Sequence, residues 1–164
     1  MMHSVKDFVK DNEQSDDLTM LAIKLKPYEM TTELIIKNEI SELNKMAAFI
    51  EELGERIGLD MSLVMNLNLA LEEAVSNIIL YAFPQKMGEE ILIKCSEMNN
   101  SLIFTISDKG IEFDPTKIEN ADTSLSAEER KIGGLGIFLI RQIMDEVKYE
   151  RINNQNILTI KKNL

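Results

Sequence analysis

The sequence predicts an α+β fold in which helices cover one face of a mixed, mainly antiparallel β-sheet. Two helical segments with apolar residues every three or four positions come first. Strand-like runs joined by short polar turns follow, and one further helix precedes the last pair of strands. Early helices, paired strands, one more helix and a final hairpin are typical of an α+β layer.

Residues 1–30 differ from the rest of the chain and are predicted to form a separate unit. An acidic, polar stretch at 11–17 precedes Leu18–Leu25, whose apolar content and length predict a β-strand. Pro27 ends this strand because proline cannot donate a hydrogen bond to a ladder. The second unit, residues 31–164, holds the remaining elements.

The second unit opens with a short strand and two helices. Glu33–Lys37 is strand-like, and Glu39–Ile57 carries apolar residues at helical spacing along one face. Gly58 caps the C-terminus of that helix. Asp60 is the expected N-cap of a second helix, which runs to about Phe83.

Two hairpins and one helix complete the prediction. The hairpins are Glu90–Glu97 with Leu102–Ser107, and Val147–Ile152 with Ile157–Lys161. Asparagine-rich turns at 98–101 and 153–156 join the strands of each pair. The polar connection 108–134 is unusually long for a compact domain unless it has a function. A helix from about Leu135 to Glu146 follows it.

Composition and charge restrict the function. The 164 residues are 45% hydrophobic and 28% charged, as in a globular protein with its own core. The net charge of −10 argues against nucleic-acid binding through counterion release and suits protein partners. A single cysteine, Cys95, excludes an internal disulfide, and the single histidine, His3, leaves little material for histidine catalysis. Without a signal-peptide core or an apolar run of about 18 residues, the chain is expected in the cytoplasm and not in a membrane.

The first stretch that could carry chemistry contains Glu73 and Asn77, which share one helix face because they are four residues apart. A carboxylate there could accept a proton from a nucleophile. An amide oxygen one turn later could ligate Mg²⁺. Ala70 and Ala74 leave space beside the pair. Taken alone, these side chains are equally compatible with a solvated face of an ordinary helix.

The second stretch is Phe104–Asp114, in which a strand runs into Asp108 and Gly110 permits backbone geometry that other residues resist. A buried carboxylate at a strand end can accept a hydrogen bond from an exocyclic amino group such as adenine N6. Asp-x-Gly is also common in ordinary turns.

The third stretch leads Gly133, Gly134 and Gly136 into an apolar helix. Backbone N–H groups at a helix N-terminus favour phosphate oxygens, and the helix dipole adds to this. A flexible hinge is the alternative. No Gly-Lys-Ser/Thr ending is present, so the stretch is not a P-loop, and it does not follow a first strand as a Rossmann motif would.

The ordered set of Glu-x-x-x-Asn, Asp-x-Gly and Gly-Gly-x-Gly resembles the GHKL ATP-binding superfamily, which includes gyrase, heat-shock chaperones, histidine kinases and MutL. Glu-Ala-Val-Ser-Asn at 73–77 and Gly-Gly-Leu-Gly-Ile-Phe-Leu-Ile at 133–140 look most like the anti-sigma-factor serine kinases. The resemblance covers about residues 31–162. It implies a two-layer α/β sandwich, the Bergerat-type ATP-binding fold.

Carried over by motif, the resemblance implies a role for each site residue. Glu73 would be the catalytic base that activates a serine hydroxyl of the partner, and Asn77 would hold Mg²⁺ against the phosphates of ATP. Asp108 would bind adenine N6. The other implied ATP-binding residues are Gly110 in the base pocket, Gly133, Gly134 and Gly136 at the helix end, Thr159 near the adenine, and Lys131 at the phosphates, where a solvated charge is the alternative. Residues 115–132 would be the ATP lid.

Two positions depart from the superfamily pattern. Many relatives have a histidine shortly after the asparagine, where this chain has Leu80 and Tyr81. Histidine kinases have a further glycine after Asp-x-Gly, where this chain has Glu112. The second departure suits the anti-sigma branch and disfavours a histidine-kinase catalytic domain.

A second, smaller resemblance lies in the N-terminal unit. Val5-x-x-Phe8-Val9, followed by Gln-Ser-Asp-Asp-Leu-Thr-Met-Leu at 14–21, looks like the closing segment of PPM-type serine phosphatases. Asp16 would be the metal-binding aspartate of that element. Since the rest of such a phosphatase is missing, the resemblance implies a remnant without phosphatase activity.

Together the resemblances imply a serine kinase and anti-sigma factor that uses Mg-ATP to phosphorylate a STAS-type anti-sigma-factor antagonist. A sigma factor would be a second partner, and a homodimer is expected from the family. The alternative is a nucleotide-dependent binding module that grips partners without phosphorylating them.

Overall fold

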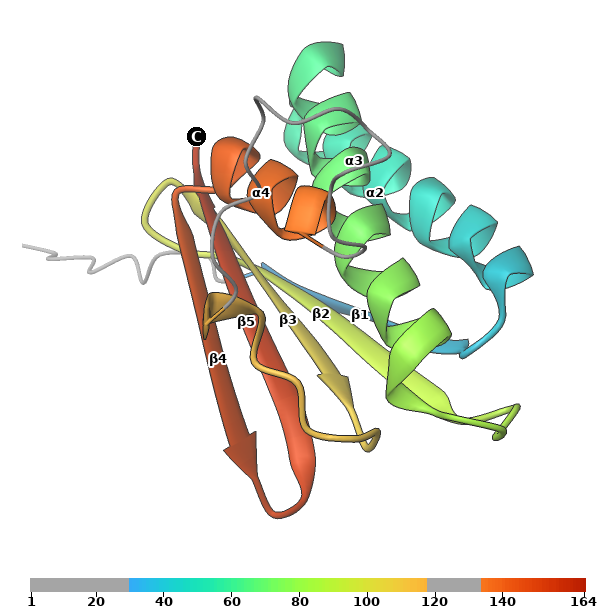
Figure 1. The fold of residues 1–164 in the computed structure, drawn as a ribbon. Helices are drawn as coiled ribbons and strands as arrows, with labels where there is room; N and C mark the ends of the chain where they lie inside the picture. The colour runs from blue at the N-terminus through green and yellow to red at the C-terminus, as the bar shows by residue number, and fades with distance from the viewer. Residues whose placement is uncertain (1–29, 118–133) are drawn as a thin grey trace, which may run out of the picture.

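The computed structural model describes residues 30–117 and 134–164, and Figure 1 shows them as two layers, with the helices on one side of a five-stranded sheet. The strands are β1 (Met30–Lys37), β2 (Glu90–Glu97), β3 (Ser101–Asp108), β4 (Glu146–Ile152) and β5 (Gln155–Asn163). Their order across the sheet is β1-β2-β3-β5-β4, and all four pairings are antiparallel. The α+β prediction is confirmed, but the expected mixed sheet is fully antiparallel.

The helical layer is built from two long helices and one shorter one. A 3₁₀ turn, η1 (Ile40–Glu42), leads into α2 (Leu43–Ile57), and α3 (Met61–Asn77) continues as a π-helix, η2 (Ile78–Ala82). A further 3₁₀ turn, η3 (Pro115–Lys117), follows β3, and α4 (Gly134–Ile143) packs against α3. The last helix ends three residues earlier than predicted, because the chain turns at residues 144 and 145 to enter β4.

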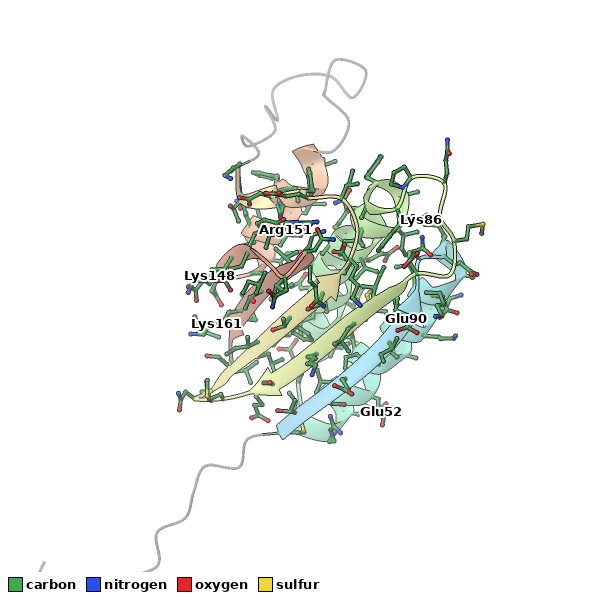
Figure 2. All side chains as sticks on the ribbon, turned by 90° about the horizontal axis from the view of Figure 1, so that it is seen from below. Glu52, Lys86, Glu90, Lys148, Arg151 and Lys161 are labelled. Atoms are coloured by element: carbon green, nitrogen blue, oxygen red, sulfur yellow. The ribbon has the colours of Figure 1, made fainter. Side chains whose placement is uncertain are left out.

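The core lies between the sheet and the helices. Alternate residues of β2, β3 and β5, such as Ile93, Phe104 and Ile160, are fully buried against Leu67 and Leu71 of α3. This alternation follows from the two-residue period of a strand. Figure 2 views the opposite face, where the charged side chains of Glu90, Lys148 and Lys161 lie on the uncovered side of the sheet.

The predicted cap residues Gly58 and Asp60 and both predicted hairpin turns are confirmed. Gly58 adopts the left-handed conformation with φ 75°, and the Asp60 carboxylate accepts a hydrogen bond from the Leu63 N–H at 3.0 Å. Positive φ angles at Asn99 (51°) and Asn100 (59°) close the first hairpin, and the Asn153–Asn154 pair does the same in the second. Asparagine tolerates this backbone region, which explains why paired asparagines mark both turns.

The predictions for the N-terminal unit and for most of the lid lie outside the described residues. They include the strand Leu18–Leu25, the metal-binding role of Asp16 and the lid segment after Lys117. The division into units at residues 1–30 and 31–164 stays a prediction.

The segment Met61–Ala82 is long and apolar enough to cross a membrane by length and composition alone, with a mean hydropathy of 1.3. Its apolar side packs against the sheet, α2 and α4 within the described part of the chain. Only 33% of this apolar window is buried, and Met61, Met65, Leu69 and Leu80 stay exposed, so packing in the core accounts for part of its hydropathy.

Candidate nucleotide-binding site

A cavity of about 260 Å³ opens between the helical layer and the C-terminal end of β3. This volume is close to the lower end of the range of about 300 to 1,000 Å³ for small-molecule pockets. Most of its wall is apolar, with a few polar groups. Its lining residues are Ala74, Asn77, Ile78, Tyr81, Ala82, Asp108, Ile111, Glu112, Phe113, Pro115, Ile137, Tyr149, Asn156 and Leu158. Two of the predicted site residues, Asn77 and Asp108, thus line one cavity although they are far apart in the sequence.

Asp108 forms the polar floor of the cavity at the end of β3. It is only 3% exposed, and its Oδ1 accepts hydrogen bonds from the Gly110 N–H at 2.7 Å and from Asn156 Nδ2 at 2.9 Å. Both hydrogen bonds that the described residues make to this carboxylate end on Oδ1. The other oxygen, Oδ2, is left as an acceptor for a ligand.

Burial raises the pKa of the Asp108 carboxyl, while the hydrogen bonds from Asn156 and Gly110 and the positive charge of Arg151 oppose the shift. The ionised form is therefore costly in the folded protein. A hydrogen-bond donor from a ligand would relieve that cost, as an exocyclic amino group would.

Gly110 is required where the chain leaves β3. A Cβ on this residue would lie 2.5 Å from Ala82 Cβ and 2.6 Å from the Ala82 carbonyl oxygen. The next residue, Ile111, donates its N–H to the same carbonyl at 2.8 Å. The glycine therefore lets the segment after β3 close against the end of η2 and form the cavity wall.

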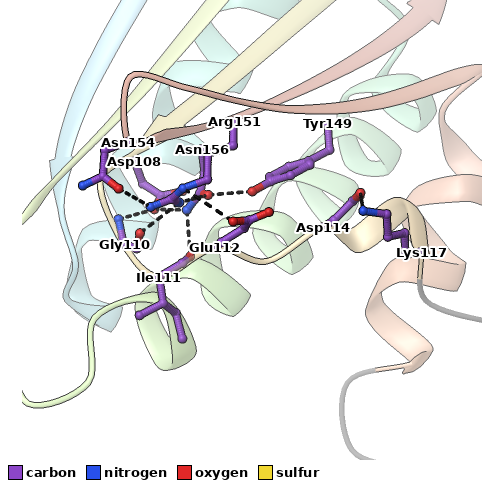
Figure 3. Close-up of polar contacts among 10 residues, drawn as sticks. All are labelled: Asp108, Gly110, Ile111, Glu112, Asp114, Lys117, Tyr149, Arg151, Asn154 and Asn156. Atoms are coloured by element: carbon purple, nitrogen blue, oxygen red, sulfur yellow. Dashed lines mark hydrogen bonds and ion pairs between the residues drawn. The ribbon is translucent and has the colours of Figure 1, made fainter.

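Asn156, Tyr149 and Arg151 form a polar network beside Asp108 that the sequence prediction missed (Figure 3). Asn156 is 6% exposed and lies in register with Asp108 on one side and Arg151 on the other. A signal was present in the sequence, since Asn156 is a polar residue that shares the inward face of its strand with the apolar residues Leu158 and Ile160.

Glu73 and Asn77 meet the N-terminal turn of α4 at the other end of the cavity. A Cβ on Gly136 would lie 3.3 Å from Glu73 Cδ and 3.4 Å from Asn77 Nδ2, and closer still to Glu73 Oε2. Both side chains are partly buried and make no hydrogen bond to another described residue. The structure thus brings three predicted residues together: Glu73, Asn77 and Gly136.

Gly134 begins α4, so the free backbone N–H groups of this helix start beside Glu73 and Asn77. Gly133 and Lys131 lie outside the described residues, and their assignments stay predictions. Arg141 of α4 donates to the carbonyl oxygens of Pro115 at 3.3 Å and Thr116 at 2.9 Å. These bonds fix the last described turn before residue 118 on α4.

The structure does not bring Thr159 to the cavity, which corrects its predicted place near the adenine. Its neighbours Leu158 and Ile160 are 7% and 0% exposed and face the helices. Because side chains alternate along a strand, Thr159 lies on the opposite, uncovered face. The inward residue of β5 closest to Asp108 is Asn156.

A magnesium ion fits this site only in company with phosphate. No cluster of three or more His, Cys, Asp or Glu side chains occurs in residues 30–117 and 134–164. Mg²⁺ keeps several waters and is commonly bound through one or two side chains and substrate phosphates. The Asn77 side chain, which lines the cavity near Gly136 and makes no hydrogen bond to another of the residues 30–117 and 134–164, suits that arrangement.

Comparison with known proteins identifies the family of the chain and agrees with this geometry. A sequence model described as "histidine kinase-like ATPase domain" matches residues 36–162, which contain all three motifs. The RsbU and RsbW domains of a Mycobacterium tuberculosis protein share the fold, with a TM-score of 0.58 and 14% identity over 82% of this chain and 32% of that one. The fold and the site therefore define an ATP-binding domain of the histidine kinase-like class, as the GHKL resemblance predicted.

The relatives narrow this class. Serine-protein kinase RsbW of Listeria monocytogenes serovar 1/2a is 31% identical over 124 residues, which are 73% of this chain and 78% of that kinase. Serine-protein kinase RsbW of Oceanobacillus iheyensis is 32% identical over 106 residues, 62% of this chain and 65% of that kinase. The chain belongs to the family of these RsbW serine-protein kinases within the histidine kinase-like ATPases.

Proposed function

We propose that this protein is a serine protein kinase and anti-sigma factor that uses Mg-ATP to phosphorylate a STAS-type anti-sigma-factor antagonist. The observation that carries the kinase role is the meeting of Glu73 and Asn77 with Gly136 beside a cavity that both Asn77 and Asp108 line. A nucleotide whose base carries an amino group would place that group at Asp108 and its phosphates near Glu73 and Asn77.

The chain's own groups have distinct tasks in this reaction. Asp108 Oδ2 accepts a hydrogen bond from the adenine amino group, and the apolar wall around Ile78 and Ile137 excludes water from the base. Backbone N–H groups at the start of α4 donate to phosphate oxygens. Asn77 holds the cation, which supplies charge neutralisation at the phosphates.

Glu73 accepts the proton of the substrate serine hydroxyl as the serine oxygen attacks the terminal phosphorus. The bond from that phosphorus to the bridging oxygen breaks at the same time, and ADP leaves with both electrons of this bond. The close approach of Gly136 leaves the Glu73 carboxylate at the side of α4 where phosphate would lie. A general base in this position contributes typically about 10²- to 10⁴-fold to a rate.

The test is Glu73→Gln, with Glu72→Gln as a matched control on the exposed neighbouring position. Transfer of labelled phosphate from Mg-ATP to the antagonist should fall about 10²- to 10⁴-fold in Glu73→Gln. ATP affinity, measured by fluorescence titration, should change little. The control should keep both properties, and undiminished transfer by Glu73→Gln would remove Glu73 as the base.

A nucleotide-dependent binding module without kinase activity is the alternative function. It is favoured by the absence of any hydrogen bond that holds the Glu73 side chain within the described residues. Such a module would bind its partner in an ATP-dependent way, yet transfer no phosphate over long incubation with the wild-type protein. The same assay therefore separates the two functions.

The partners follow from the family resemblance and the charge. A sigma factor and the antagonist would be bound in the cytoplasm by a homodimer, with no nucleic-acid or membrane partner. The net charge of −10 supports protein partners over nucleic acid. Sedimentation equilibrium, with and without the sigma factor, measures both the dimer and the complex.

For residues 1–30 we propose a phosphatase-like segment and linker that has no phosphatase activity of its own. The motif around Asp16 supports this assignment. The full chain should release no phosphate from a phosphoserine peptide in the presence of Mn²⁺ or Mg²⁺. Hydrolysis by the wild-type chain that disappears in Asp16→Asn would refute this absence of activity.

A further inference from the structure

The Asn156 side chain makes four hydrogen bonds beside Asp108, at the end of the cavity proposed to hold the base and called the base end below (Figure 3). Its Oδ1 accepts from the Tyr149 hydroxyl at 2.7 Å and from Arg151 Nη1 at 2.5 Å. Its Nδ2 donates to Asp108 Oδ1 at 2.9 Å and to the Ile111 carbonyl oxygen at 2.9 Å. All the hydrogen-bonding capacity of a buried amide is thus used.

These partners allow only one orientation of the amide. A flipped amide would place the Nδ2 donor against the Arg151 guanidinium, which carries only donors, and Oδ1 against the Asp108 carboxylate. Arg151 is itself fixed, because it donates to the Gly110 carbonyl oxygen at 3.2 Å and to Asn154 Oδ1 at 2.7 Å, and its Nε lies 3.9 Å from Glu112 Oε2.

The orientation has a consequence for Asp108. The N–H groups of Gly110 and Asn156 both donate to Oδ1, and such donors stabilise the negative charge of the carboxylate against the effect of burial on its pKa. They therefore favour the ionised form, in which Oδ2 meets the ligand as an acceptor. A ligand amino group can donate to it, whereas a ligand carbonyl oxygen at the same place would face a negative charge.

We propose that Asn156, held by Tyr149 and Arg151, is the positioning residue that makes this site select 6-aminopurine over 6-oxopurine nucleotides. The inference rests on the proposed nucleotide site and deepens it. The carboxylate alone would not give this selectivity, because a buried carboxyl without its donors takes up a proton and then donates to a carbonyl oxygen.

The test compares three triphosphates that differ at position 6 of the purine: ATP, the triphosphate of purine riboside, which lacks the amino group, and ITP, which carries an oxygen. In the wild-type full chain, loss of the amino group should weaken binding about tenfold to a hundredfold. ITP should bind more weakly still. These ratios of dissociation constants are the readout, because a general loss of folding would weaken all three ligands equally.

Asn156→Leu removes the donor at similar size, and Asn156→Asp places a second carboxylate beside Asp108. Both variants should reduce the ATP-to-ITP ratio to about threefold or less. In Asn156→Asp the two carboxyls share one proton, so ITP binding should strengthen as the pH falls. Tyr149 and Arg151 of β4, Glu112 after β3 and Tyr81 of η2 are the other titratable or charged groups at this end of the cavity. In the wild type, by contrast with Asn156→Asp, the ratio of ATP to ITP affinity should not change between pH 6 and 8.

Tyr149→Phe removes only a hydroxyl group and tests the role of Asn156 even if substitutions of Asn156 itself unfold the protein. It should lower the ATP-to-ITP ratio about twofold to fivefold. Thr105→Val, on the uncovered face of β3, is the matched control and should keep the wild-type ratio. An unchanged ratio in variants that still bind ATP overturns the inference alone. A wild-type protein that binds none of the three nucleotides refutes the proposed function as well.

Discussion

The two ends of the cavity are built differently. At the base end, Asp108, Asn156 and Arg151 lie in register across three strands, and hydrogen bonds to protein atoms fix them. At the phosphate end, Glu73 and Asn77 lie on α3 against the first turn of α4 and make no hydrogen bond to another described residue. The base end is prepared for its ligand before the ligand arrives. The phosphate end leaves its polar atoms for the ligand and the cation to use.

This difference matches the tasks that we propose for the two ends, recognition of the base and transfer of the phosphate. Recognition of a base requires donors and acceptors that do not rotate, because selectivity is a difference between two affinities. Phosphoryl transfer requires groups that act on charge that appears only during the reaction. Substitutions at the base end should therefore change selectivity and stability, whereas those at the phosphate end should change transfer.

The largest effect is expected from removal of the metal. Chelation of Mg²⁺ should abolish transfer to the antagonist, because Asn77 is the one metal-binding residue proposed at the nucleotide site and the phosphates of ATP must supply further ligands to the ion. The ratio of ATP to ITP affinities should stay as it is with the metal present, since no predicted metal contact lies at the base end. Competition titrations with and without EDTA measure this ratio, and a change in it would show that the two ends are not independent.

Gly136→Ala should come next, with transfer reduced about 100-fold. The added Cβ would collide with the Glu73 carboxylate, and a displacement of about 1 Å near a reacting group can cost a factor of that size. Since the colliding atoms belong to the end of a flexible side chain, the melting temperature should change little. Single-turnover transfer and thermal melting test the two halves of this prediction. A large loss of stability would contradict it.

Gly110→Ala, unlike Gly136→Ala, should act mainly on stability and lower the free energy of unfolding by about 1 to 3 kcal/mol. Its Cβ would meet the Ala82 carbonyl oxygen at 2.6 Å and Ala82 Cβ at 2.5 Å, and backbone atoms cannot move aside as a carboxylate can. Urea unfolding compares this variant with Gly136→Ala as the matched glycine control. Equal stability of the two variants would remove the contrast between the two ends.

The smallest effect is expected for Asp108→Asn in the absence of nucleotide. Burial raises the pKa of Asp108 in the folded protein, so the unfolded chain loses this proton first as the pH rises. The wild-type stability therefore falls between the unfolded pKa of about 3.9 and the higher folded pKa, and the penalty persists above it. Asp108→Asn removes the penalty and should equal or exceed the wild type in stability above that range. Its advantage should disappear near pH 3.

Urea midpoints at several pH values measure this difference, and Asp145→Asn on an exposed carboxylate is the control. An Asp108→Asn variant less stable than the wild type at pH 7 would show that the carboxylate holds the base end together. In that case the base end would owe its order to the charge and not to the Asn156 network.

Much of the fold could be predicted from the sequence because its signals are local. Helical spacing in Glu39–Ile57, the cap residues Gly58 and Asp60, and the paired asparagines of both turns depend on neighbouring residues only, and the structure confirms them. The features of the fold that were predicted incorrectly depend on contacts between residues far apart in the sequence. The fully antiparallel sheet follows from the order of all five strands, and the early end of α4 from its junction with β4.

In the site, too, some features follow from local sequence and others from long-range contacts. The sequence by itself determined that Glu73 and Asn77 share a helix face and that Asp108 ends a strand, since helix and strand periods require it. Only the tertiary structure decided that Gly136 lies against Glu73, that Asn156 and not Thr159 stands beside Asp108, and that Arg151 holds it there. The physical reason is that strand register and helix packing join residues with no local relation, and the selectivity proposed for this site rests on those contacts.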